Sequence, residues 1–173
     1  MLERIGRRVG LAALLLCAVL CGCSQPREVP FESLLSFTST EWKKREPRLI
    51  VMSDPEDLEF LPVLVHSRPF DELVAAGKID SSSHVLLVAY WGVRPNGGYE
   101  IEILRIQRSG RRIEVQAKFV SPKRGQTVEA MVMYPYHLVR VKKADLNGQG
   151  RLKFVLVDAS SGEEVVSETH TVR

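Results

Sequence analysis

Hydrophobic residues from position 84 onward either alternate with polar residues or form short continuous runs, and both patterns are typical of β-strands. The apolar run over 84–91 predicts a central strand that is buried on both faces. Residues 99–106 alternate strictly until the pattern slips near its end, and a turn at 109–111 leads into a second alternating strand over 113–119. These two strands are expected to form a hairpin. Further strands are expected over residues 48–53, 136–142, 151–157 and 164–172.

Two short helices are expected near the start of this β-rich region. Ser53 and Glu56 have the spacing of a capping box, and Pro55 suits the first helical position. Residues 70–77 have the pattern of one or two helical turns that end at Gly77. Six or seven strands with so little helix predict a mainly β fold, which is an antiparallel β-sandwich or partly open barrel with one or two short helices near the start of the domain.

The N-terminus has the organisation of an export signal. Three arginines precede an apolar and small-residue stretch over 9–20, which is shorter than the ~20 apolar residues that a membrane-spanning helix needs. The run that follows, Leu20-Cys21-Gly22-Cys23, resembles the lipobox read by bacterial lipoprotein signal peptidase. We therefore expect residues 1–22 to be a signal peptide and Cys23 to carry a lipid that holds the chain on a membrane. A retained membrane anchor is the alternative.

The rest of the chain is expected to form a tether over 23–47 and one β-rich domain over 48–173. The tether is polar, charged and rich in proline, with few residues to bury. Ser24, next to the lipid site, is compatible with transport to the outer membrane, so the expected location is the bacterial cell envelope, facing the periplasm or the cell surface. All three cysteines lie in or beside the signal. The domain should therefore contain no disulfide and no cysteine nucleophile.

Charge argues against a nucleic-acid partner. The chain has 24 basic and 21 acidic residues, and the signal contains three of the former and one of the latter. Removal of the signal leaves 21 against 20, which is a net charge close to +1. The basic residues are scattered among acidic ones, whereas nucleic-acid binding needs a concentrated basic face.

No familiar catalytic or cofactor motif is present in the sequence. There is no HExxH, no GxSxG and no P-loop, and the four histidines are not spaced like zinc ligands. Residues 145–150 resemble the opening of a calcium loop, but Leu156 stands where an EF-hand supplies its bidentate glutamate, so a hairpin loop is expected. We therefore expect no enzyme activity, no metal and no cofactor. The histidines, which are expected to be solvated or locally bonded, are His66, His84, His137 and His170.

The most distinctive segment lies between the apolar strand and the first alternating strand, and it is followed downstream by two related segments. Glycines after Pro-Asn allow positive φ angles and close backbone approach, which serve either a tight strand connection or contact with a partner. The segments are Trp91-Gly92-Val93-Arg94-Pro95-Asn96-Gly97-Gly98-Tyr99, then Val120-Ser121-Pro122, and then Met133-Tyr134-Pro135-Tyr136-His137-Leu138-Val139.

Together these segments resemble the C-terminal domain of the PrcB family of protease-complex lipoproteins, over about residues 80–143. Asn96 stands where that family usually has threonine, which puts a hydroxyl contact in doubt. The resemblance implies a non-catalytic accessory role beside a surface protease complex. The glycine loop also has a weaker likeness to a loop of immunoglobulin-like cysteine-protease inhibitors.

The expected function is therefore a lipid-anchored envelope protein that binds another envelope protein, which the resemblance suggests is a protease complex. A structural lipoprotein without a protease link and an immunoglobulin-like protease inhibitor are the alternatives. Exposure distinguishes contact residues from core residues. The expected partner contacts are Arg94, Pro95, Asn96, Gly97, Gly98 and Tyr99, with Tyr134, Pro135, Tyr136 and His137.

Overall fold

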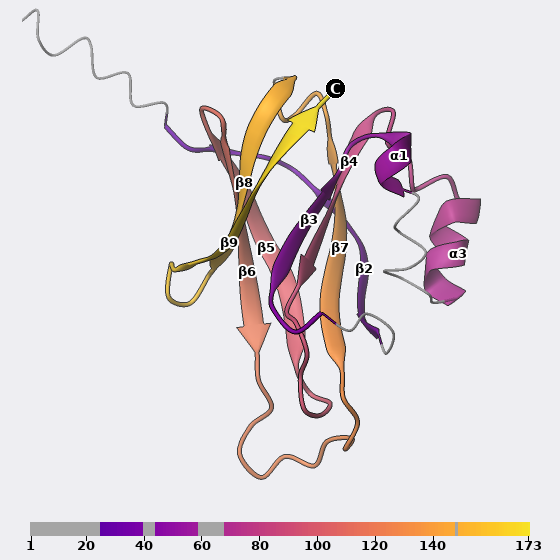
Figure 1. The fold of residues 1–173 in the computed structure, drawn as a ribbon, viewed down its shortest axis with the longest axis vertical. Helices are drawn as coiled ribbons and strands as arrows, with labels where there is room; N and C mark the ends of the chain where they lie inside the picture. The colour runs from indigo at the N-terminus through magenta and orange to yellow at the C-terminus, as the bar shows by residue number, and fades with distance from the viewer. Residues whose placement is uncertain (1–24, 40–43, 59–67, 148) are drawn as a thin grey trace, which may run out of the picture.

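The computed structural model describes residues 25–39, 44–58, 68–147 and 149–173, which form two β-sheets packed face to face, with two helices beside one of them (Figure 1). The predicted mainly β sandwich is confirmed. The elements are β1 (Arg27–Glu28), β2 (Glu32–Ser39), β3 (Arg48–Met52), α1 (Pro55–Leu58), α3 (Arg68–Ala75), β4 (His84–Tyr90), β5 (Glu100–Ser109), β6 (Arg112–Val120), β7 (Tyr134–Lys142), β8 (Gly150–Asp158) and β9 (Glu164–Val172).

The five-stranded sheet has the order β1-β5-β6-β8-β9, and all its pairs are antiparallel except β6 with β8. The predicted hairpin is confirmed as β5 and β6, joined at Gly110, which has a φ of 60°. The slip in the alternating pattern is a β-bulge between Ile103 and Arg105. It leaves Leu104 exposed and turns Ile106 into the core.

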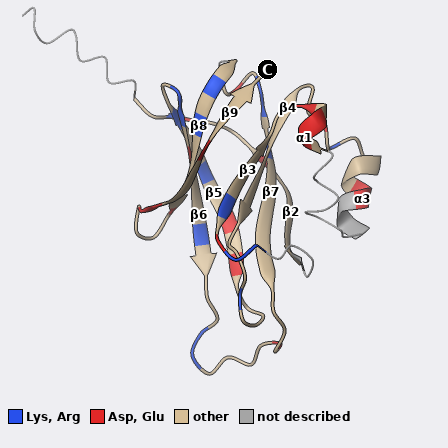
Figure 2. Cartoon of the chain, in the orientation of Figure 1, with Lys and Arg blue, Asp and Glu red and all other residues tan. Residues whose placement is uncertain are grey.

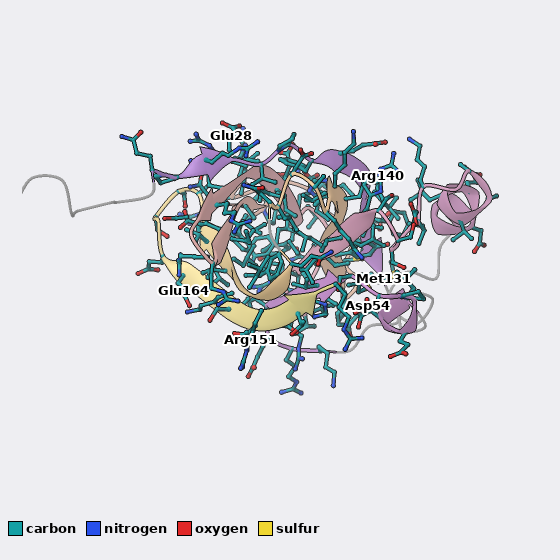
Figure 3. The ribbon with its side chains drawn as sticks, turned by 90° about the horizontal axis from the view of Figure 1, so that it is seen from above. Glu28, Asp54, Met131, Arg140, Arg151 and Glu164 are labelled. Atoms are coloured by element: carbon teal, nitrogen blue, oxygen red, sulfur yellow. The ribbon has the colours of Figure 1, made fainter. Side chains whose placement is uncertain are left out.

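The four-stranded sheet has the order β2-β7-β4-β3, all antiparallel. The prediction that the apolar run forms a central strand buried on both faces is confirmed for β4. Alternate residues such as Leu87 face the core between the sheets, where side chains fill the space (Figure 3). The intervening residues, such as Leu86, face a second apolar cluster that includes Leu58 of α1 and Leu73 of α3. The helices therefore cover the outer face of this sheet.

Part of the segment predicted as a tether is sheet structure. β1 pairs with β5 and β2 pairs with β7, so this short segment crosses from one sheet to the other along one side of the sandwich. Val29 is buried between the two strands, and Leu34 and Leu35 pack on the second apolar cluster. The polar composition of this segment gave no sign of strands, because an edge strand that is held by backbone pairing needs few buried side chains. Residues 23, 24 and 40–43 lie outside the described residues.

The start of α1 differs from the predicted capping box by one residue. Asp57, not Glu56, reaches back, and its Oδ2 accepts the backbone N–H groups of Ser53 at 2.8 Å and Asp54 at 3.1 Å. Asp54 is therefore the N-cap residue. Neither described helix is long and apolar enough to cross a membrane. Basic and acidic residues are interspersed along β5 and β6 of the five-stranded sheet, whereas β4 of the other sheet carries neither (Figure 2).

Candidate partner-binding loops

Two loops lie at the same end of the sandwich and contain most of the predicted contact residues (Figure 1). We call residues 91–99 and 121–133 the loop platform. Arg94 and Met133 exchange two backbone hydrogen bonds, of 2.8 and 3.0 Å, which join the two loops. The N–H of Gly97 donates to the carbonyl oxygen of Glu129 at 2.8 Å. The loops therefore form one hydrogen-bonded unit.

Aromatic rings and one arginine fix the centre of the loop platform. Trp91 makes edge-to-face contacts with Tyr99 and Phe119, with ring centroids 5.3 and 5.2 Å apart. The Arg94 guanidinium lies 4.4 Å from the Trp91 ring centroid and donates to the Trp91 carbonyl oxygen at 2.6 Å. Burial lowers the pKa of Arg94 from its usual value, the nearby Tyr99 opposing that shift. Because Arg94 and Tyr99 pack on Trp91, much of their surface is buried inside the protein and stabilises the fold.

The glycines of this region face the protein's own chain. Gly98 has a φ of 81°, and a Cβ there would lie 2.8 Å from Val128 Cγ1. Gly92 has a φ of 84°, and a Cβ there would lie 2.3 Å from the carbonyl oxygen of Arg45. The sequence allowed two uses for these glycines, a tight strand connection or contact with a partner. The structure shows that their close backbone approach is to the protein's own chain.

Fewer of the predicted contact residues in the loop platform are exposed than the sequence analysis expects. Pro95 and Gly98 are exposed, Asn96 is half-buried and Gly97 is buried. Met131 and Val132, which the sequence analysis did not select, are exposed to 47% and 48%. No periodicity marks them, because they lie in a loop.

The second predicted contact segment belongs to the core. Tyr134 is half-buried, and Pro135, Tyr136 and His137 are buried in β7. The prediction that these last three contact a partner is wrong for their side chains, since neighbouring strands and rings cover them. Tyr136, for example, packs edge-to-face against Phe37 of β2.

His137 links three strands across the sandwich. Its Nδ1 accepts the backbone N–H of Ile103 on β5 at 2.8 Å, and its Nε2 lies 2.7 Å from Ser33 Oγ on β2. An amide N–H can only donate, so Nδ1 carries no proton and the neutral imidazole donates from Nε2 to Ser33. Burial lowers the pKa of His137, and Glu102 opposes this shift. The histidine is thus a structural bridge, which its place in an apolar strand did not indicate.

A second polar cluster, from residues far apart in the sequence, joins α1 to β9. His170 Nε2 lies 2.8 Å from Ser53 Oγ and 3.5 Å from Asp57 Oδ2. Ligand atoms of Asp54, Asp57 and His170 lie within 4.8 Å of one another, so these residues could hold a metal ion. A serine hydrolase needs its histidine to contact serine and aspartate through different nitrogens. Here both contacts use Nε2 and Ser53 is fully buried, so the cluster lacks that geometry.

The loop platform and the His137 bridge lie almost entirely within one stretch of the chain. Residues 85–142 match the PrcB C-terminal family. The match confirms the resemblance that the glycine loop and the Tyr-Pro-Tyr-His segment indicate, and it covers 58 of the 173 residues. No curated protein and no solved structure is significantly similar to the chain. Within the PrcB C-terminal region, the motif residues mainly build the connections between β4, β5, β6 and β7.

Proposed function

We propose that this protein is a lipid-anchored, non-catalytic envelope accessory protein that binds another envelope or surface protein and stabilises or modulates a protease complex. The observation that supports this most is the PrcB C-terminal match, which coincides with a hydrogen-bonded loop platform at one end of the sandwich. The lipid anchor rests on the signal and lipobox pattern that ends at Cys23, a residue outside the described part of the chain.

The exposed rim of the loop platform is the proposed contact surface. Met131 and Val132 offer apolar area, and Pro95 and Gly98 offer a backbone held in one conformation. Single exposed apolar residues are common, but two consecutive ones in a hydrogen-bonded loop form a patch that a partner can cover. Arg94, Asn96 and Tyr99 contribute only their half-exposed edges.

An affinity pull-down from envelope extracts, read by mass spectrometry, tests this function. The wild-type chain should capture a defined envelope protein, and the double variant Met131→Asp/Val132→Asp should capture at least about tenfold less of it, as for hot-spot residues. Val74→Asp is the matched control, because Val74 is equally exposed, to 52%, but lies on α3. Equal capture by all three chains would show that the loop platform is not the contact surface.

The two alternatives give different results. An immunoglobulin-like inhibitor would slow a cysteine protease in a purified assay, and a structural lipoprotein would neither capture nor inhibit. Turnover of peptide, ester or glycoside substrates that is abolished by Ser53→Ala or His170→Ala would refute the non-catalytic role.

A further inference from the structure

We propose that the open edges of β2 and β5 form a groove that binds an extended peptide segment of a protein partner by strand addition. The inference rests on the proposed function only in that the chain acts by binding a protein. It names a groove on the side of the sandwich that borders the loop platform at Tyr99 and Met133, and the kind of segment that fits it.

The edge of β2 that faces away from β7 has outward backbone groups. The carbonyl oxygen of Pro135 accepts the N–H of Trp91, on the β4 side of β7. Thr38, which is opposite Pro135, is therefore in a non-hydrogen-bonded pair, and its own N–H and C=O point away from β7. Ser36, two residues earlier, points the same way. β2 is the last strand of its sheet, so no described strand pairs with these groups.

The edge of β5 is covered only at its far end. β1 pairs with Gln107 and Arg108, and the N–H of Val29 bonds the carbonyl oxygen of Ile106. Toward its start, the outward N–H of Ile103 is taken by His137. Ile101, two residues earlier, has its N–H and C=O on the same outward side. No described strand lies along β5 at that point.

These two edges line one groove of about 350 Å³, formed by residues 36–38 of β2 and 99–101 at the start of β5, with Met133 and Pro135 as the remaining lining. Facing rows of backbone donors and acceptors fit an extended chain, because its own N–H and C=O groups alternate at the same spacing. A helix satisfies these groups internally and offers none to the groove. The occupant is therefore an extended peptide.

The side chains around the groove determine which residues the bound peptide should contain. Phe37 is exposed to 45% at the rim, so an apolar side chain of the peptide has a ring to cover. Glu100 and Glu102 are exposed along the outer face of β5, and neither forms an ion pair with a described basic residue. The complementary peptide alternates apolar residues with others and carries a lysine or arginine near Glu100.

Panning of a random linear peptide library, displayed on phage, against the immobilised full chain tests the proposal. Enriched peptides should share the alternating apolar and basic pattern, and synthetic copies should bind Thr38→Pro at least about tenfold more weakly than wild type, because the proline removes an outward N–H. Thr169→Pro is the matched control. Thr169 faces Lys153, whose N–H bonds the carbonyl oxygen of Arg111, so its N–H also points outward, on the edge strand of the other sheet.

Ser36→Pro is the second variant should Thr38→Pro fail to fold. Absence of enriched peptides, or equal binding by the wild type and both β2 variants, would overturn the groove. A concentration-dependent dimer that Thr38→Pro abolishes would assign the edges to a second copy of the chain and would also overturn it. Peptide binding without capture of an envelope protein would refute the accessory function alone, and capture unaffected by the β2 variants would refute the groove alone.

Discussion

Replacement of His137 by asparagine should remove a pH dependence of folding that the wild-type protein has. His137 is 3% exposed, and its Nδ1 must be unprotonated to accept the Ile103 N–H. Protonation would place two donors face to face and a charge in the core. Burial accordingly lowers the pKa of His137 in the folded state.

The sign and size of the effect follow from proton linkage. A histidine with a lowered folded pKa contributes its full stability above the unfolded pKa, about 6.5, and stability is lost as pH falls below that value, because the unfolded chain then binds the extra proton. One proton changes the free energy of unfolding by about 1.4 kcal/mol per pH unit at most. Between about pH 7.5 and about pH 5.5 the loss from His137 is therefore at most about 1.4 kcal/mol.

Urea unfolding at several pH values measures this loss. The oxygen of asparagine can take the place of Nδ1 as acceptor, so His137→Asn should lose less unfolding free energy than the wild type over that window, by at most about 1.4 kcal/mol. His137→Ala should lose about 1–3 kcal/mol at every pH, because it leaves the Ile103 N–H buried without a partner. If the free energy of unfolding of His137→Asn fell with pH as steeply as that of the wild type, the reasoning would be refuted.

Three further predictions follow from the loops and the N-terminus. Gly92→Ala should lower the free energy of unfolding in urea by about 2 kcal/mol or more, because its Cβ would collide with a backbone carbonyl. The control Gly110→Ala, also at positive φ but in open space, should lower it by only about 1 kcal/mol. Equal losses in the two variants would contradict this reasoning. Tyr99→Ala should cost at least about 1 kcal/mol of stability through its contact with Trp91, and an unchanged unfolding midpoint would show that the ring contributes nothing to folding. Cys23→Ala should leave an uncleaved, unlipidated precursor, and intact mass showing cleavage elsewhere in the wild type would refute the assigned site.

The sequence by itself determined the strands from β3 onward and the hairpin of β5 and β6. β5 and β6 alternate because one face of each is buried, and β4 is continuously apolar because both of its faces are buried. Buried positions favour apolar residues, so these strands can be predicted from the order of residue types. The family resemblance was readable because the glycine loop and the Tyr-Pro-Tyr-His segment are local motifs.

Only the tertiary structure decided what the candidate residues do. The direction of Tyr136 and His137 depends on which strands flank β7, and Gly98 is needed because Pro122 and Val128 come close to it from a distant loop. The Ser53 and His170 contact joins residues 117 positions apart. The open edges of β2 and β5 depend on strand order, which is set by long-range backbone pairing. Backbone pairing is nearly independent of side-chain identity, so it leaves no pattern in the sequence.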